Sequence, residues 1–395
     1  MNDQKGSKLK IIQTIRMMGK VSRINLTRLT GLSRATISLS IAELIQMNIV
    51  QETTERYSTG GRPATFLELV PNSCYVLGAD FANRAWTLAA FDPTGEVHRK
   101  ITIPVANPTA EETIQTLLEE IIPFARQLDK PPVPLLGIGA PGLVDADHST
   151  IRSVPELGWN NINLGTIVSK KIGWTSVIIN RHRARGLAEC RYGSGQQYTN
   201  QIYIGIGSGI AAGIYIDRRL LPGTRGGAGE IAHSTVEPDG PLCPCGNNGC
   251  LHVLSSASAI EQEFRKHVRS RGINYSKQDR NYDLQLVRAT DICLAAEQGD
   301  ESAAAVIRMA ASYLGIVMAN LVNLINPEAI ILGGSIPNSS PLFVQTATEV
   351  MHRRAMHSLA AGTEVKVNKL KEIGGALGAA NFALDEKAEI SMFGP

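Results

Sequence analysis

Three cysteines and one histidine crowd into a short stretch of the sequence, in a spacing typical of a metal site. Cys243, Cys245 and Cys250 lie within eight residues, and His233 precedes the first of them by ten. Thiolate and imidazole groups suit zinc, and four of them form a closed tetrahedral set. Because no coordination position is left for water, the spacing predicts a structural Zn²⁺. The alternative is three reduced thiols in a loop.

The elements that must position this cluster belong to a large α/β protein. The chain has 395 residues, 43% of them apolar, and 37 glycines, which favours two or three globular domains. Its longest apolar segment, residues 314–325, contains Asn320 and Asn323 and is shorter than the ~20 residues of a membrane span. The first residues resemble no secretory signal. A cytoplasmic protein without membrane contact is therefore expected.

Positive charge is concentrated at the N-terminus. Residues 1–70 carry ten Lys or Arg and five Asp or Glu, a net charge of +5. Since the whole chain carries +3, the remainder carries −2 (3 − 5). A basic module on a nearly neutral body indicates that only the module meets a polyanion. Charge alone favours a solvated basic face.

The first fifty residues follow the plan of a helix-turn-helix. An apolar stripe predicts a first helix that ends at Gly19, and Ser22 caps a second one. A turn at Gly31 follows, and Ser33 caps a third helix. Its expected buried residues are Ile37, Ile41, Leu44 and Ile45, and its expected outward residues are Ala35, Thr36, Ser38 and Leu39. Small polar residues at the start of a helix let it enter a major groove.

Two alternating segments, 49–52 and 65–69, predict strands on either side of a wing at residues 57–63. Gly-Gly-Arg-Pro in this wing lets one arginine enter a narrow minor groove. The candidate DNA-binding residues are Ser33, Arg34, Thr36, Ser38 and Arg62. Taken alone, each of these segments could also belong to a small helical cap or to a dimerisation module. The pieces together, in this order and with the charge excess, favour DNA binding.

The rest of the chain alternates strands with helices and places glycines at strand ends. Strands are expected at 75–80, 86–92, 135–139, 202–206 and 330–334, with helices at 111–127 and around 314–325. This order predicts α/β lobes with a cleft between them.

Several stretches of this part resemble the ROK family, whose members are repressors, open reading frames and kinases. The matching stretches are GAPGLVD (139–145), LGWNN (157–161), GSGIAAGIYI (207–216), GGAGEIAH (226–233), CPCGNNGC (243–250) and LVNLINPEAIILGG (321–334). Glycine loops alone are weak signals, whereas the Gly-Glu-Ile-Ala-His segment followed by the three-cysteine loop is highly specific. With the N-terminal module, the resemblance covers nearly the whole chain.

The resemblance implies an N-terminal winged helix-turn-helix followed by a two-lobed actin-like fold, the ribonuclease H-like fold of ATPases and sugar kinases. It assigns residues 1–72 to DNA binding. It assigns residues 73–180 and 372–395 to the first lobe. Residues 181–371 form the second lobe, with the zinc loop and dimerisation helices. It also implies that the zinc holds the segment from Glu230 to His233 against the ligand cleft.

The same resemblance implies that kinase chemistry has been lost. The kinases of the family use an Asp in an Asn-Asp-Ala-Asn stretch to accept the proton of the sugar hydroxyl. Here the stretch is Asn-Arg-His-Arg at 180–183, so Arg181 stands where the base should be, and arginine accepts no proton at cellular pH. The Asp-x-Gly-Gly-Thr loop that meets phosphate becomes residues 80–84, which keep Asp80 but lack the glycines and threonine. No enzyme activity is expected.

Six residues match the positions that hold the sugar in the family. They are Asn180, Arg181, Arg183, Glu230, His233 and His252. Two carboxylates of the family pattern are missing and two arginines are added. Positive charge in a partly desolvated cleft predicts an acidic effector, such as a sugar phosphate or sugar acid. The alternative is that the arginines pair with internal carboxylates such as Glu189.

The expected function is therefore a transcription regulator, a repressor, of genes for carbohydrate uptake or catabolism. Its expected partners are a double-stranded DNA operator, a sugar-like effector and a second copy of the chain, in a homodimer or tetramer. An ATP-dependent sugar kinase with an accessory DNA-binding domain is the alternative. A regulator that has lost its ligand is a third reading, disfavoured by Glu230, His233 and the intact cysteine loop.

Overall fold

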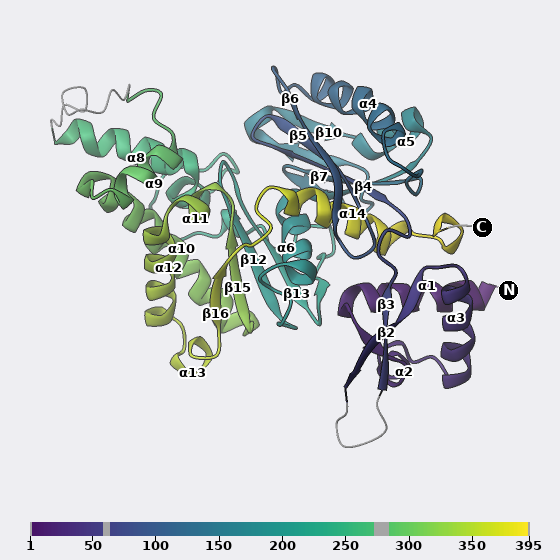
Figure 1. Ribbon diagram of the computed structural model, residues 1–395. Coiled ribbons are helices and arrows are strands. Elements are labelled where there is room, and N and C mark those ends of the chain that lie inside the picture. Colours follow the sequence, from purple (N-terminus) through teal and green to yellow (C-terminus); the bar gives the residue numbers. More distant parts are fainter. Residues whose placement is uncertain (1, 58–63, 272–283, 394–395) are drawn as a thin grey trace. The chain divides into compact units, whose positions relative to one another are not determined.

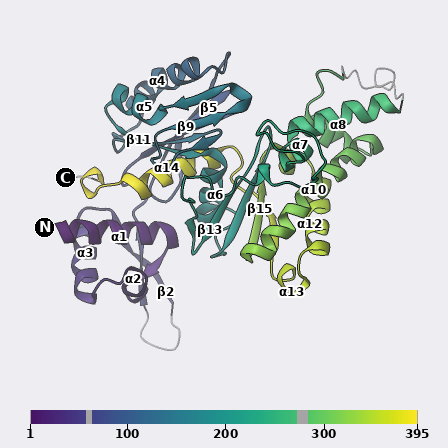
Figure 2. The ribbon, with the colours of Figure 1, turned by 180° about the vertical axis from the view of Figure 1, so that it is seen from behind.

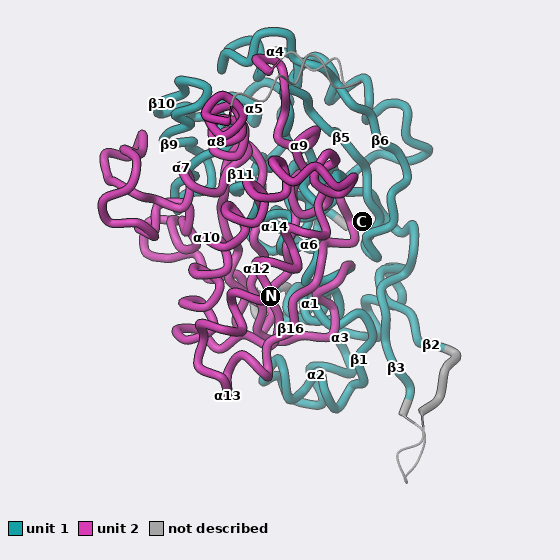
Figure 3. Tube along the Cα trace, turned by 90° about the vertical axis from the view of Figure 1, so that its left-hand side faces the viewer, with its two compact units in different colours: residues 1–192, 372–395 teal, residues 193–371 magenta. Residues whose placement is uncertain are grey.

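Helices cover two five-stranded sheets, one in each of two units (Figure 1). The computed structural model describes residues 2–57, 64–271 and 284–393. Unit 1 comprises residues 1–192 and 372–395, and unit 2 comprises residues 193–371 (Figure 3). The expected mixed α/β class is confirmed.

Two serines define where the N-terminal helices begin. The hydroxyl of Ser22 accepts a hydrogen bond from the amide of Asn25 at 3.2 Å, and that of Ser33 accepts one from the amide of Thr36 at 3.1 Å. Both serines are therefore N-caps, as expected, and each satisfies an amide that the helix leaves free. The elements are α1 (Asn2–Met18), β1 (Val21–Ser22), α2 (Arg23–Thr30), α3 (Arg34–Gln46), β2 (Val50–Tyr57) and β3 (Ala64–Leu69).

One side of α3 packs into the core of this N-terminal module. Ile37, Ile41 and Leu44 are buried together with residues of α1 and β3, as the sequence predicts. The prediction that Ile45 is buried is wrong, because its side chain is 39% exposed. At about 100° per residue, Ile45 lies about 80° around the helix from Ile37, at the edge of the apolar stripe.

Strands β1, β3 and β2 form an antiparallel sheet, in that order. β2 extends further than the predicted segment 49–52 and shifts register between Glu52 and Arg56. The tip of the predicted wing, with Arg62, lies outside the described residues.

The sheet of unit 1 has the order β11-β7-β4-β5-β6. Its two faces differ because side chains alternate along each strand. Leu77, Ala79 and Phe81 of β4 pack with the apolar residues of α4 and α5 on one face. The opposite face meets α14 and α6 (Figures 1 and 2). The elements are β4 (Val76–Ala82), β5 (Ala85–Phe91), β6 (Val97–Pro104), α4 (Ala110–Arg126), β7 (Leu135–Ala140), α5 (Leu164–Ile172), β11 (Thr175–Asn180), α6 (Arg181–Tyr192) and α14 (Ile373–Lys387).

Small residues let α14 approach the sheet closely. A Cβ on Gly78 of β4 would lie 2.0 Å from the carbonyl oxygen of Ala376, and one on Gly375 would lie 2.1 Å from a carboxylate oxygen of Asp80. No larger side chain fits at either position without moving the helix. The glycines of β4 and α14 are therefore packing requirements.

Asp80 lies on this crowded face, 1% exposed, at the carboxyl-terminal half of β4. Its Oδ2 accepts a hydrogen bond from the guanidinium of Arg185 on α6 at 2.8 Å. The Arg185 side chain is 13% exposed. A buried carboxylate needs such a partner because its desolvation is unfavourable.

Unit 2 has a sheet of order β14-β13-β12-β15-β16. α10 provides the largest part of its apolar core, together with α8, α9 and α12. By length and composition, α10 is the one helix among the described residues that could cross a membrane, but 61% of its apolar window is buried in unit 2. The core helix of a soluble protein can have the same length and apolar composition. The elements are β12 (Gln201–Ile206), β13 (Ile210–Ile216), β14 (Arg219–Leu220), α7 (Leu251–Ser255), α8 (Ala257–Ser270), α9 (Ala289–Glu297), α10 (Glu301–Ile325), β15 (Ala329–Gly333), α11 (Ser335–Ser339), α12 (Pro341–Arg354), α13 (His357–Ala360) and β16 (Glu364–Val367).

Short elements complete both units. A three-stranded antiparallel sheet of order β10-β9-β8 adjoins the main sheet of unit 1. The elements are β8 (Leu143–Val144), β9 (Ile151–Val154), η1 (Pro155–Leu157), β10 (Trp159–Ile162), η2 (Ile231–His233) and η3 (Ile390–Phe393).

The Asp80–Arg185 pair predicts the effect of removing one charge. Arg185→Met should lower the free energy of unfolding by about 3 kcal/mol, because a buried carboxylate is left without its partner. Urea denaturation measures this change. The double variant Asp80→Asn/Arg185→Met should recover part of the loss, since the amide is uncharged. Arg126→Met, exposed at the end of α4, is the control and should change it by less than about 0.5 kcal/mol. An Arg185→Met variant as stable as the wild type would contradict the view that Arg185 neutralises a buried Asp80.

Candidate metal centre and effector residues

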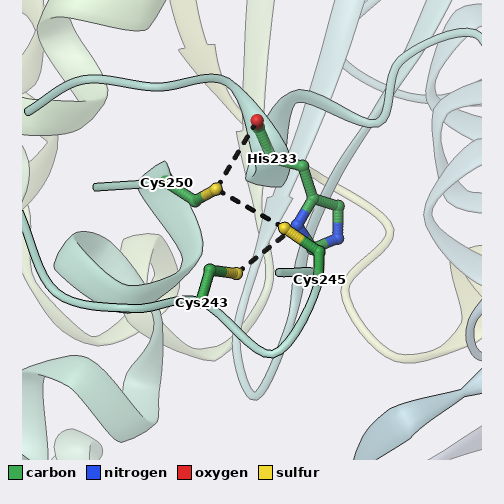
Figure 4. A group of neighbouring side chains, drawn as sticks. All are labelled: His233, Cys243, Cys245 and Cys250. Atoms are coloured by element: carbon green, nitrogen blue, oxygen red, sulfur yellow. Dashed lines mark hydrogen bonds between the residues drawn. The ribbon is translucent and has the colours of Figure 1, made fainter. Parts of the chain in front are cut away.

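His233, Cys243, Cys245 and Cys250 meet in unit 2 with their ligand atoms all within 4.8 Å of one another (Figure 4). The Sγ of Cys243 lies 3.7 Å from Nδ1 of His233, and the Sγ atoms of Cys245 and Cys250 are 3.7 Å apart. Zn–S bonds of about 2.3 Å in a tetrahedron place sulfur atoms about 3.8 Å apart. The four side chains therefore fit around one tetrahedral ion.

Glycines shape the loop that carries the cysteines. Gly246 and Gly249 have φ values of +93° and +61°, as expected of residues that permit its turns. At Gly249 a Cβ would also lie 1.5 Å from the carbonyl oxygen of Glu237. The amide of Val236 donates to the Gly249 carbonyl at 2.8 Å, and the amide of Leu251 donates to the Ser234 carbonyl at 3.0 Å. These bonds fasten the cysteine loop to the segment that follows His233.

The loop is also held to the core helix of unit 2. The hydroxyl of Tyr313 on α10 donates to a carboxylate oxygen of Glu237 at 2.8 Å. Cys243 and Cys250 are buried, and His233 and Cys245 are exposed. Burial raises the pKa of the Cys250 thiol to about 12 in the metal-free chain, whereas the amide of Asn247 lowers that of Cys245. A bound cation would have to displace the proton of Cys250.

Of the predicted effector residues, His233 belongs to this cluster, and Glu230 and His252 lie near it in the sequence. Glu230 precedes the short helix η2, which ends at His233, and His252 lies in the first turn of α7. The imidazole rings of His233 and His252 have centroids 6.2 Å apart. When Nδ1 of His233 binds a metal, its Nε2 carries the proton and remains a donor.

The other three predicted effector residues lie in unit 1, where β11 passes into α6. Asn180 is buried, and its Oδ1 accepts hydrogen bonds from the amides of His182 at 2.9 Å and Arg183 at 3.3 Å. Its Nδ2 donates to the carbonyl of Gly142 at 2.8 Å. Asn180 is thus the N-cap of α6 and ties this helix to the loop after β7.

The two arginines that follow differ in their surroundings. Arg181 is half-buried and its guanidinium lies 3.5 Å from the carbonyl oxygen of Phe81, whereas Arg183 is 5% exposed. Residues two apart point to different sides of a helix. Burial and the neighbouring Arg181 and Arg185 lower the pKa of His182 well below 6.5, so this ring is neutral at pH 7.

Sequence reasoning missed Arg185. It lies four residues after Arg181, on the same side of α6, and that spacing was the available signal. Its pairing with Asp80 occupies the acid that the family pattern places near phosphate. Of the residues after Asp80, Phe81 and Ala82 still belong to β4, and Asn83 and Arg84, with φ values of +51° and +60°, form the two-residue turn of the β4–β5 hairpin.

The predicted DNA-binding residues lie at the start of α3. Ser33, Arg34 and Ser38 are exposed and Thr36 is half-buried. The hydroxyls of Ser33 and Thr36 lie 2.9 Å apart within the helix cap. Arg34 and Ser38, four residues apart, share one outward side, and Leu39 beside them is 52% exposed.

Comparison with known proteins gives relatives along nearly the full length. The xylose repressor of Caldicellulosiruptor bescii is 29% identical over 379 residues, 94% of each chain. The DNA-binding transcriptional dual regulator NagC of Escherichia coli K12 is 28% identical over 385 residues, 96% of this chain and 92% of its own.

Solved structures share the fold. A ROK family transcriptional regulator, a homologue of the E. coli MLC protein, has a TM-score of 0.80 and 27% identity, covering 97% of this chain and 96% of its own. A ROK family glucokinase from Streptomyces griseus, solved with glucose and AMPPNP, has a TM-score of 0.69 and 27% identity, covering 79% of this chain and 99% of its own. These matches confirm the expected sugar-kinase fold of the ROK part of the chain. The ROK family profile matches residues 76–386, and the chain belongs to this family.

Proposed function

We propose that this chain is a DNA-binding transcription regulator, a repressor, of genes for carbohydrate uptake or catabolism. The observation that carries the proposal is the reach of the similarity. The matches to the regulators cover 92–97% of this chain and of the regulators themselves. The match to the glucokinase covers 99% of the glucokinase but only 79% of this chain. The ROK profile match begins at residue 76, so the basic module at residues 1–72 lies outside it. The three-domain division of the chain is part of this proposal.

In this function α3 is the recognition helix. Arg34, Thr36 and Ser38 lie near base edges, and the backbone amides at the start of the helix, which Ser33 caps, face phosphate. Arg62 enters the minor groove. A homodimer, or a tetramer built from it, presents two such modules to a palindromic operator.

The alternative, a sugar kinase, is disfavoured by two features of unit 1. Arg181 stands where the family's kinases have their catalytic base, and arginine accepts no proton at cellular pH. Asp80, the acid of the phosphate loop, is already paired with Arg185 at 2.8 Å. The geometry at both positions supports a protein that binds a ligand without converting it.

The proposed effector is sugar-like and acidic. Its contacts are Asn180, Arg181, Arg183, Glu230, His233 and His252. The proximity of His233 and His252 supports the second half of this set, and the half-buried Arg181 supports the attraction of an anion. Binding of the effector would change the fraction of the protein that is in the conformation that binds DNA.

The function predicts effector-dependent DNA binding. A duplex selected from random sequence by the full-length protein should bind with nanomolar affinity. Xylose, N-acetylglucosamine, N-acetylglucosamine 6-phosphate and glucuronate are then titrated while fluorescence anisotropy reports binding. At least one should change the dissociation constant by about fivefold or more, and the acidic members should act at lower concentration.

A coupled phosphotransfer assay with ATP and the same sugars is the control for the alternative. Turnover that depends on ATP, together with no selected duplex, would establish the kinase instead. A response to neutral sugars alone would leave the regulator standing and overturn the acidic effector.

We propose further that the Cys₃His cluster binds one structural Zn²⁺. His233, Cys243, Cys245 and Cys250 would hold it, and the ion would brace the loop that bears Glu230. Three thiolates and one imidazole leave no position for reactive water, so the ion supplies structure alone.

The metal content of purified protein tests this. The wild type should contain about one zinc per chain, and Cys250→Ser should contain almost none, because three ligands hold zinc poorly. Elemental mass spectrometry measures both. Cys74→Ser is the matched control, since Cys74 lies in unit 1 and should leave the zinc unchanged. Equal zinc in the Cys250 and Cys74 variants would overturn the assignment.

A further inference from the structure

Four side chains from three helices of unit 1 meet in a largely buried charged cluster. Arg16 belongs to α1, Arg191 to the last turn of α6, and Asn381 and Asp385 to α14. The side chains of Arg16 and Arg191 are 1% and 6% exposed. We call these four residues the clasp, because α1 is part of the N-terminal module and the two other helices are not.

Hydrogen bonds join the three helices at the same two residues of α14. The guanidinium of Arg16 donates to the carbonyl oxygen of Asn381 at 2.9 Å and to its Oδ1 at 3.0 Å, and lies 3.2 Å from Oδ1 of Asp385. The guanidinium of Arg191 donates to the same Asn381 Oδ1 at 3.2 Å and pairs with the other carboxylate oxygen of Asp385.

Two further contacts close the clasp. The hydroxyl of Tyr192, next to Arg191, also donates to Oδ1 of Asn381 at 2.9 Å, and Gln13 of α1 donates to the carbonyl oxygen of Asp385 at 3.0 Å. One amide oxygen therefore receives donors from both α1 and α6. A movement of either helix along its axis changes the bonds of the other.

This arrangement favours orientation over stability. Arg16 and Arg191 share the single carboxylate of Asp385, so the cluster has an excess of positive charge. Buried ion pairs add little to the net free energy of folding. They do require a particular geometry, since a guanidinium and a carboxylate bind through fixed directions. An apolar contact would hold α1 as firmly without specifying its angle.

The other end of α6 carries predicted effector residues. The helix begins where Asn180 caps it and Arg181 follows, and it ends at Arg191 and Tyr192. Its 12 residues span about 18 Å. α6 also packs along α14, where a Cβ on Gly378 would lie 1.7 Å from the carbonyl oxygen of Ala184, so the two helices touch backbone to backbone.

We propose that α6 carries effector occupancy to the DNA-binding module through the clasp, with Arg191 as the positioning residue that couples them. This inference rests on the proposed function. An anion drawn to Arg181 displaces the start of α6, Arg191 moves with it, and Arg16 with α1 must follow through Asn381 and Asp385. The module then takes a different angle, which changes its fit to the operator.

Arg191→Met in the full-length protein tests the proposal, with Arg126→Met as the matched control on an exposed helix end. The probe is whichever compound of the sugar panel changes DNA binding by the wild type. Arg191→Met should bind this compound, by calorimetry, within about threefold of the wild type. The effect of the compound on the DNA dissociation constant should fall from about fivefold or more to less than about twofold. The control should keep the full effect.

Tyr192→Phe is the milder second variant, because it removes only one donor from Asn381. If Arg191→Met fails to fold, Tyr192→Phe should still reduce the effect while both binding constants stay near those of the wild type.

A wild type that responds, with full effects in both Arg191→Met and Tyr192→Phe, would overturn the inference alone. A wild type that selects no duplex, or responds to no compound, would overturn the proposed function and this inference with it.

Discussion

Burial of a charged helix is the constraint on which unit 1 depends. α6 reads Arg-His-Arg-Ala-Arg-Gly-Leu-Ala-Glu-Cys-Arg-Tyr, yet most of it is buried, packed along α14 and against β7 and β11. Charges removed from water need partners nearby, and α6 finds them at both ends. Arg185 pairs with Asp80 near the start, and Arg191 pairs with Asp385 at the end. Gly378 of α14 and the clasp with α1 both meet this helix.

The pairing of buried charges on α6 also bears on whether a protein of this fold binds a ligand or phosphorylates it. A kinase needs an accessible acid near phosphate and a free base near the sugar. Here Arg185 pairs with Asp80, and we propose that Arg181 stands at the position of the base. The ROK profile matches residues 76–386, so the N-terminal module lies outside the part of the chain that defines the family. In the function that we propose, helix contacts link ligand binding to DNA binding.

The features that the sequence predicts are local ones. Ser22 and Ser33 act as caps through bonds to amides three residues away, and the cysteine spacing brings three thiols together within one loop. Arg185 and Asp80 are 105 residues apart, and Arg16 and Asn381 are 365 apart, so no pattern in the sequence joins them. Even within one helix the prediction of burial failed at Ile45, because the pattern of apolar residues does not define how far around the helix the buried face extends.

The central claim is that this protein regulates genes by binding DNA in response to a sugar-like compound. Genome-wide mapping of bound DNA in the source cell, followed by footprinting of the strongest site, tests it most directly. The account predicts a small set of palindromic sites beside genes for uptake and breakdown of one carbohydrate. It also predicts that Arg34→Ala loses these sites. No enrichment above background for the wild type, with or without the carbohydrate in the medium, would contradict it.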